Sequence, residues 1–194
     1  MDLYSNYSID QDIATLDAGG GVRLEMIDDR HADETFSMIR SNKEHLGEWL
    51  PWVNKIQTTA DFRVYIRQCK QQHQAGTDCG YMIYWNDHLA GRIGLHYIHR
   101  HNRSGAIGYW LGKEFEGKGI VTRSCASMLH LGFTRLGLNR IEIKCGVGNL
   151  KSAAIPERLG FSKEGVLRQA EWVNGGFLDL SLYSLLKEEW QAQH

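Results

Sequence analysis

The 194-residue chain lacks the features that mark membrane and secreted proteins. It contains no stretch approaching 18 uninterrupted apolar residues, so we expect no membrane-spanning helix. Its first residues, Met1 to Asn6, lack the basic start and apolar core of a signal peptide. The chain has only 4 cysteines, widely spaced and without a Cys-x-x-Cys pair. This pattern favours a reducing, cytoplasmic location.

An excess of charge of one sign is also missing. The 22 Lys and Arg residues nearly balance the 23 Asp and Glu residues, which leaves a formal net charge of −1. This balance gives no reason to expect a broad nucleic-acid footprint, although a local basic patch is compatible with it. We therefore expect neither nucleic acid nor membrane among the partners.

Proline is scarce, with 2 residues, whereas glycine is abundant, with 21. Glycine makes up about 11% of the chain, against an average of roughly 7%. Most glycines lie between apolar segments rather than in Ser- and Pro-rich runs, so turns and close backbone approaches explain them better than linkers. The length, with 42% apolar and 23% charged residues, predicts one globular domain over residues 1–194.

Hydrophobic periodicity predicts a mixed α/β or α+β class, with strands in the middle of the chain and alternating strands and helices later. An alternating segment over residues 8–27 surrounds Gly19–Gly21 and predicts a strand that fits the second arm of a hairpin. Helices are predicted at Arg30–Leu46, Thr58–Gln74, Thr122–Leu138 and Leu150–Leu159. The other strands are predicted at Tyr81–Trp85, Leu89–Ile98, Ala106–Leu111, Ile141–Val147, Phe161–Leu167 and Leu178–Leu186.

Two glycines, Gly117 and Gly119, lie in a short loop between a predicted strand and a predicted helix. Such a loop directs bare backbone N–H groups outward at a helix N-terminus, where the dipole favours an anion such as phosphate. Lys118 and Arg123 would add positive charge nearby. The alternative is a tight turn that needs glycine for its conformation alone. The loop has neither the Lys-Ser/Thr pair of a nucleotide-triphosphate loop nor the G-x-G-x-x-G dinucleotide pattern.

Four blocks of sequence, in order along the chain, resemble the GNAT N-acetyltransferase superfamily, in its branch that acetylates the N-termini of ribosomal proteins. Gly108–Leu111 with Glu116–Ile120 resembles the acetyl-CoA-binding segment. The second block consists of Ile141–Cys145, Asn149, Ser152, Glu157–Phe161 and Glu164–Gly165. The third block is Arg168–Gly175. The fourth lies upstream and consists of Asn42–Leu46 and Trp49–Trp52.

The resemblance implies a mixed, strongly twisted sheet of about six to seven strands, with helices on both faces and the cofactor where two central strands part. It implies acetyl transfer from acetyl-CoA to a primary amine, most directly the N-terminal α-amine of a ribosomal protein, with no metal. It also suggests a homodimer. The implied acetyl-CoA contacts are Trp110, Leu111, Gly117, Lys118, Gly119, Ile120, Val121, Thr122 and Asn149.

The resemblance assigns further roles, each with a plainer alternative. Glu171 is the expected general base, directly or through water; otherwise it is a surface carboxylate. Ser152 is expected to give the departing thiolate a hydrogen bond or proton; otherwise it is an ordinary serine of a first helical turn. The N–H of Trp110 or Leu111 would stabilise the tetrahedral intermediate. Trp49 and Trp52 are expected to line the acceptor groove, although core packing is an alternative for either.

The chain departs from the family pattern at two positions. Glu114 stands where Gln or Arg is common. Pro156 lies inside the predicted helix after Asn149 and cannot donate an N–H to the carbonyl of Ser152. We therefore expect a bent or loosened first turn, with a free acceptor beside the active centre.

Two other features suggest chemistry less strongly. His96, His99 and His101 fit a hairpin tip better than a metal site, because no carboxylate or thiol ligand lies nearby in sequence. Cys125 and Cys145 fall on apolar faces, where a thiol is inert. Two rival functions stay open: acetylation of a small amine such as a polyamine, amino acid or aminoglycoside, and a non-catalytic acyl-CoA sensor.

Overall fold

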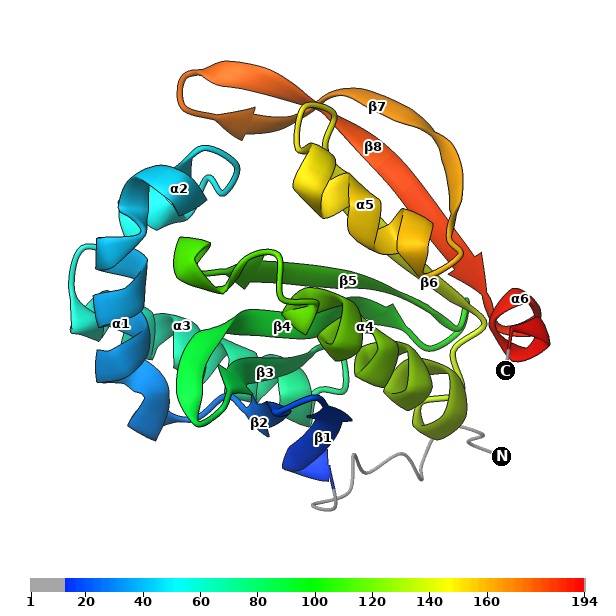
Figure 1. Ribbon diagram of the computed structural model, residues 1–194, viewed down its shortest axis with the longest axis horizontal. Helices are drawn as coiled ribbons and strands as arrows, with labels where there is room; N and C mark the ends of the chain where they lie inside the picture. Colours follow the sequence, from blue (N-terminus) through cyan, green and yellow to red (C-terminus); the bar gives the residue numbers. More distant parts are fainter. Residues whose placement is uncertain (1–12, 194) are drawn as a thin grey trace.

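The computed structural model describes residues 13–193, which form one eight-stranded mixed sheet with helices on both faces (Figure 1). The strand order is β1-β2-β3-β4-β5-β6-β8-β7, with β5 and β6 parallel and all other neighbours antiparallel. The strands are β1 (Thr15–Gly19), β2 (Val22–Met26), β3 (Cys79–Trp85), β4 (His88–His99), β5 (Ser104–Leu111), β6 (Arg140–Gly146), β7 (Ser162–Val173) and β8 (Gly176–Leu186). The helices are α1 (Ala32–Ser41), α2 (Lys43–Gly47), α3 (Thr59–Gln74), α4 (Ile120–His130), α5 (Leu150–Arg158) and α6 (Lys187–Ala192).

The predicted fold class is confirmed, but the expected six to seven strands were too few. The additional strand is β1, which pairs with β2 through a turn in which Gly19, Gly20 and Gly21 all have positive φ. A Cβ on Gly20 would lie 2.8 Å from Nε of Arg123, so the turn also needs glycine to accommodate that side chain. The part of the 8–27 prediction before residue 13 lies outside the described residues.

Successive side chains on the central strands point to opposite faces of the sheet, which creates two hydrophobic cores. On β3, Tyr81 and Ile83 pack into the core that includes α4, whereas Met82 points to the opposite core with Phe62 and Ile66 of α3. Figure 1 shows α4 and α5 on one side of the sheet and α1 and α3 on the other. The two covered faces explain why β3 and β4 are buried at successive positions rather than at alternate ones.

Several predicted helices have different ends in the structure. The 30–46 prediction divides at Asn42 into α1 and α2, after a 3-10 turn, η2 (Asp29–His31), that Asp28 caps. Thr58 caps α3 reciprocally with Asp61, as its sequence favours. The 122–138 prediction begins earlier, at Ile120, and after His130 becomes a π-helical turn, η5 (Leu131–Arg135). Helix α6 was not predicted.

The β7–β8 hairpin extends far beyond the predicted strand end at Leu167. Figure 1 shows it crossing over α5 and reaching toward α2. Its turn is fixed there, because Asn174 Nδ2 donates to the carbonyl of Gly47 at 2.8 Å. The hairpin therefore closes over one end of the sheet instead of lying flat beside it.

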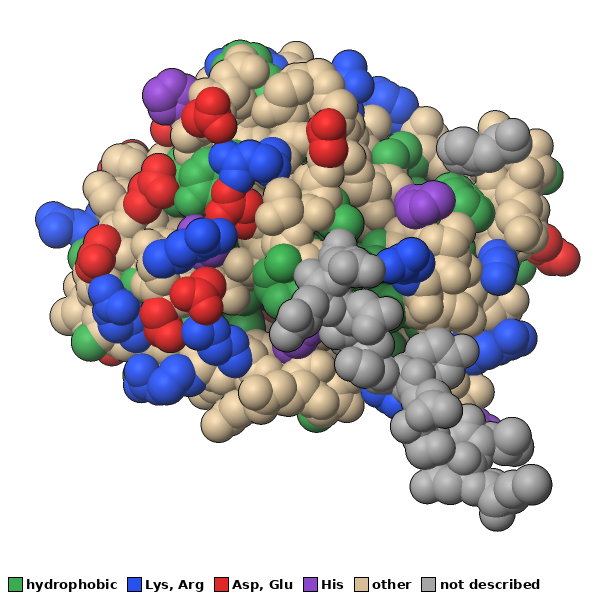
Figure 2. Space-filling view, turned by 90° about the horizontal axis from the view of Figure 1, so that it is seen from below, with side chains coloured by type: hydrophobic (Ala, Val, Ile, Leu, Met, Phe, Trp, Pro, Cys, Tyr) green, Lys and Arg blue, Asp and Glu red, His purple; other side chains and the backbone are tan. Residues whose placement is uncertain are grey.

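Charges of both signs are interspersed on the surface. Figure 2 shows the underside of the molecule, where Lys and Arg side chains alternate with Asp and Glu side chains. Ion pairs of this kind include Arg30 with Glu25 at 2.6 Å and Lys70 with Asp29 at 2.9 Å. The coloured residues of this face therefore present no broad basic area. Within residues 13–193, every helix is too short or too polar to cross a membrane.

The pairing of β5 with β6 gives a stability prediction. Ile143 is 1% exposed and is the last residue of β6 that pairs with β5. Ile143→Ala should lower the free energy of unfolding by about 2–5 kcal/mol, because it leaves a cavity in the core. Urea unfolding measures this loss. Val166→Ala, on the exposed surface of β7, is the control and should change stability by less than about 0.5 kcal/mol; equal effects would contradict this account of the core.

Candidate active site

The two central parallel strands part at the middle of the sheet. Residues 104–107 of β5 pair with residues 140–143 of β6, and the pairing ends at Ile107 and Ile143. Both strands continue, β5 to Leu111 and β6 to Gly146, while each keeps its other neighbour. Backbone groups on the inner edges of the two strands beyond this point therefore face a gap rather than a partner strand.

The direction of the N–H groups on β5 follows from its pairing with β4. The N–H of Gly112 donates to the carbonyl of Ala90 at 2.8 Å, and N–H directions alternate along a strand. The N–H of Trp110 therefore also faces β4, whereas the N–H of Leu111 faces the gap. The Trp110 side chain is 7% exposed and packs in the core on the α3 side. Of the two residues expected to donate to an oxyanion, the geometry favours Leu111.

The glycine loop leads directly into α4. Gly117 and Gly119 have φ of +74° and +73°, and a Cβ on either would meet nothing within 4 Å. The conformation therefore requires glycine, and the space beside it is open to solvent. Gly119 is the N-cap of α4, and no side chain caps the first-turn N–H groups of Ile120, Val121 and Thr122. These donors suit an anion.

Cationic side chains surround the loop but are held by local partners. Lys118 Nζ donates to the carbonyl of Glu114 at 2.8 Å and lies 4.6 Å from the centre of the Trp85 ring. Arg123 lies across the β1–β2 turn. Arg158 of α5 donates to Oγ1 of Thr122 at 3.2 Å, which links the first turn of α4 to α5. The bond to Lys118 uses the backbone carbonyl of residue 114, so it does not depend on the departure from the family pattern at Glu114.

Helix α5 presents Asn149 and Ser152 beside the gap. Oδ1 of Asn149 accepts the Ser152 N–H at 3.0 Å, as expected of an N-cap. The carbonyl of Ser152 is not free, contrary to the prediction from Pro156: the hydroxyl of Tyr109 on β5 donates to it at 3.0 Å. The helix is continuous through Pro156. Tyr109 was not predicted from the sequence. Two signals could have indicated it: it is next to Trp110 in the glycine-containing block, and the Ser152 carbonyl, which has no helical donor because residue 156 is proline, needs a donor from another element.

Glu171 lies on β7, three residues before Asn174, which bonds the end of α2. Three residues of β7, Arg168–Ala170, bulge between the pairs Leu167↔Leu180 and Glu171↔Leu178, and Asp179 Oδ1 accepts the N–H of Gln169 at 2.7 Å. Such a bulge redirects the side chains that follow it. Glu171 is partly buried, its burial raises the pKa of its carboxyl above the usual range, and it forms no ion pair with any residue in the described range.

The two tryptophans have different surroundings. A Cβ on Gly146 would lie 2.8 Å from the Trp49 ring and 3.1 Å from Leu178 Cδ2, so Trp49 covers the end of β6 beside Leu178. Leu178 is directly paired with Glu171, and paired residues share a face of the hairpin. Trp52 packs against Trp110 with ring centres 6.1 Å apart. Trp49 therefore lies on the same side as Glu171, whereas Trp52 borders the core.

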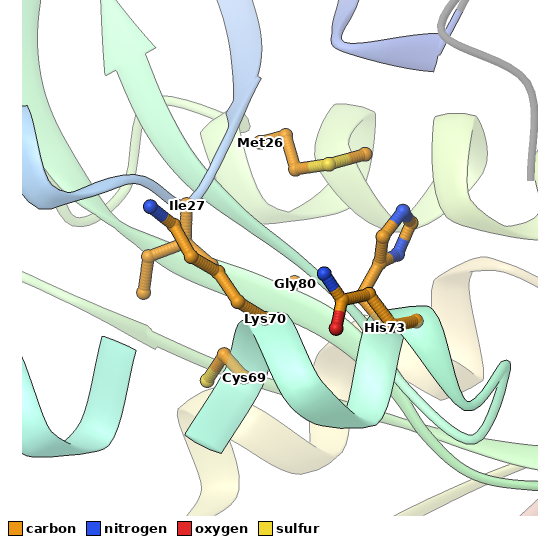
Figure 3. Close-up of a pocket in the computed structure, with 7 residues that line it drawn as sticks. Met26, Ile27, Cys69, Lys70, His73 and Gly80 are labelled. Carbon is orange, nitrogen blue, oxygen red and sulfur yellow. The ribbon is translucent and has the colours of Figure 1, made fainter. Parts of the chain in front are cut away.

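A small pocket elsewhere in the molecule is distinct from this site. Figure 3 shows it between α3 and the adjoining ends of β2 and β3, with a volume of about 130 Å³. Its lining residues are Met26, Ile27, Cys69, Lys70, His73, Gln74 and Gly80. None of them belongs to β5, β6, α4 or α5, so the pocket has no part in the chemistry discussed here.

Among the other candidate groups, His96 and His99 have structural partners. His96 is hydrogen-bonded to Asp78, and Nδ1 of His99 accepts the N–H of Asn102 at 3.3 Å in the β4–β5 turn. Among residues 13–193, no three His, Cys, Asp or Glu side chains converge as metal ligands would. Cys125 and Cys145 are buried, and burial raises the pKa of both thiols.

Comparison with known proteins identifies the family. The family model for the acetyltransferase (GNAT) domain matches residues 22–162. The chain belongs to the GNAT acetyltransferases. This GNAT enzyme is 37% identical to YdaF of Bacillus subtilis, over 89% of the chain and 94% of YdaF. It is 31% identical to the ribosomal-protein-serine acetyltransferase of Escherichia coli, over 88% of the chain and 95% of that protein.

A solved structure shares the fold almost completely. RimL, a ribosomal L7/L12 α-N-protein acetyltransferase solved in complex with coenzyme A, has a TM-score of 0.87 and 27% identity, covering 90% of this chain and 99% of RimL. The GNAT resemblance of the sequence blocks is thereby confirmed. The chain is an acetyl-CoA-dependent N-acetyltransferase that is similar over most of its length to ribosomal-protein acetyltransferases.

The glycine loop gives a binding prediction with a matched control. Gly119→Ala should raise the Kd for acetyl-CoA by about tenfold or more, because holding an alanine at positive φ costs roughly 1–3 kcal/mol and relief of this strain moves the first-turn donors. Isothermal titration calorimetry measures the Kd. Gly175→Ala has the same type of strain, with φ +81° and open space around it, but lies in the β7–β8 turn. An equal rise in Kd for both variants would contradict the anion-binding role.

Proposed function

We propose that this enzyme transfers the acetyl group of acetyl-CoA to the N-terminal α-amine of a protein, most specifically a ribosomal protein. The amine attacks the thioester directly and forms a tetrahedral intermediate. The observation that carries the proposal is Glu171, a partly buried carboxylate with a raised pKa and no ion-pair partner in the described chain, which faces the Trp49 side of the molecule. The similarity to ribosomal-protein acetyltransferases over nearly the whole chain supports the acceptor class.

Acetyl-CoA would be held mainly by backbone donors. In this proposal, its pyrophosphate binds the N–H groups of Gly117–Thr122 at the start of α4, and Lys118 adds charge. The pantetheine arm enters the gap between β5 and β6, where the side-chain amide of Asn149 is available while its oxygen caps α5. A site built from amides needs few cations, which agrees with a chain of net charge −1.

Glu171 would act as the general base. An α-amino group has a pKa of about 8 and is mostly protonated at neutral pH, so attack requires loss of a proton. Burial strengthens the Glu171 carboxylate as a base, because it destabilises the charged form and raises the pKa. Glu171 accepts the proton directly or through a water molecule.

Two further groups would stabilise the charges that develop during transfer. The Leu111 N–H faces the gap and would donate to the oxyanion, where one such donor is worth about 3 kcal/mol. Ser152 would donate to the thiolate as it leaves. Both groups lie beside the parted strands, so they act on the same thioester.

The acceptor would enter between α2 and the β7–β8 hairpin, with Trp49 and Trp52 against its first residues. A cytoplasmic location, a single functional domain and a homodimer complete the proposal.

The role of Glu171 predicts a change in rate without a change in cofactor affinity. Glu171→Gln should lower kcat by about 10²–10⁴-fold while the Kd for acetyl-CoA stays the same. Since the carboxylate is the active form, wild-type kcat should fall at acidic pH, with a midpoint above the ordinary 4.5 of Glu; the variant should lack this limb. Glu164→Gln on the same strand, where Glu164 pairs with Arg140, is the control and should retain kcat. Loss of acetyl-CoA affinity in Glu171→Gln would argue against a base.

The acceptor class is tested by thiol release with a panel of N-terminal peptides, polyamines, amino acids and aminoglycosides. We expect higher kcat/KM for peptides with a free N-terminus, and no turnover of the same peptides after N-terminal blocking. Strict preference for a small amine would contradict the proposed protein acceptor and support the rival function, acetylation of a small amine. Binding of acetyl-CoA without thiol release for any amine would indicate a sensor.

A further inference from the structure

The backbone of Ser152 is held by side chains at both its donor and its acceptor. Its N–H donates to Asn149 Oδ1, and its carbonyl accepts from Tyr109 Oη. In a regular helix that carbonyl would bind the N–H four residues later, but residue 156 is proline and has none. Tyr109 therefore supplies, from the sheet, the hydrogen bond that α5 cannot make for itself.

The same tyrosine also contacts the Ser152 side chain. Tyr109 Oη lies 3.1 Å from Ser152 Oγ as well as 3.0 Å from the Ser152 carbonyl oxygen. Tyr109 has one proton, and the carbonyl can only accept, so the tyrosine O–H donates to the carbonyl and the serine O–H donates to Oη. Burial raises the pKa of Tyr109 well above its usual value of 10, which keeps it protonated at every working pH.

We propose that Tyr109 is the positioning residue of Ser152 and that Pro156 makes this possible by leaving the Ser152 carbonyl without a helical donor. Tyr109 fixes both the turn that carries Ser152 and the rotamer of its hydroxyl. When the thiolate departs, a rotation about Cβ–Oγ aims the serine O–H at sulfur without moving the helix. The inference rests on the proposed role of Ser152 toward the leaving group.

A double-mutant cycle tests the coupling. Tyr109→Phe retains the ring and removes Oη; we expect kcat to fall about tenfold with the Kd for acetyl-CoA unchanged, a tenfold change being about 1.4 kcal/mol. In a Ser152→Ala background the same substitution should have no further effect on kcat. Tyr183→Phe is the matched control, because Tyr183 is also a sheet tyrosine whose hydroxyl donates to α5, at Glu157 Oε1. It should leave kcat unchanged in both backgrounds.

A third substitution separates positioning of the hydroxyl from support of the helix. Pro156→Ala restores a backbone N–H that can donate to the Ser152 carbonyl. The double variant Tyr109→Phe/Pro156→Ala should therefore regain the free energy of unfolding that Tyr109→Phe loses, as measured by urea unfolding. We expect kcat to stay low in this double variant. Recovery of kcat together with stability would overturn the inference, as would equal effects of Tyr109→Phe with and without Ser152. Full activity of Ser152→Ala would overturn both the inference and the proposed role of Ser152. Additive effects of Tyr109→Phe and Ser152→Ala on kcat would overturn the inference alone.

Discussion

The pairing between β5 and β6 stops at Ile107 and Ile143, and the site depends on what lies beyond that point. Each strand keeps its antiparallel neighbour, so both stay extended while their inner edges separate. An unpaired inner edge is costly when buried, since backbone groups need partners. In the proposed complex, the pantetheine arm of acetyl-CoA would enter the gap and offset this cost. The other elements of the proposed active site are the α4 N-terminus, Ser152 on α5 and the hairpin that carries Glu171.

The elements that close the site are fixed by hydrogen bonds between distant segments. Asn174 joins the hairpin turn to the end of α2, and Asn42 Oδ1 accepts the N–H of Lys113 just after β5. Trp49 covers Gly146 where β6 ends. These contacts join α2 and the loop after it to the ends of β5 and β6 and to the hairpin, without a disulfide among the described cysteines, all four of which are free.

Much of this arrangement could be predicted from the sequence, because it depends on local patterns. Alternation and helical spacing located most elements, and the order of the motif blocks identified the family. The long-range geometry could not be predicted. Periodicity does not show that β7 continues to Val173 through a bulge, because that bulge depends on Asp179 of the neighbouring strand. Nor does it show that the carbonyl freed by Pro156 binds Tyr109, because that donor comes from a strand 43 residues away. The sequence alone left both Trp110 and Leu111 as candidates for the proposed oxyanion donor, and only strand pairing distinguishes the directions of their N–H groups.

We propose that the parted strands bind the thioester with the Leu111 N–H toward its carbonyl oxygen. A crystal structure with a non-reactive thioether analogue of acetyl-CoA would test this arrangement. We predict that the analogue's pantetheine arm lies between β5 and β6, with its acetyl carbonyl oxygen about 3 Å from the Leu111 nitrogen and its pyrophosphate on the first turn of α4. A carbonyl oxygen bound elsewhere, or a pantetheine arm outside the gap, would contradict the account.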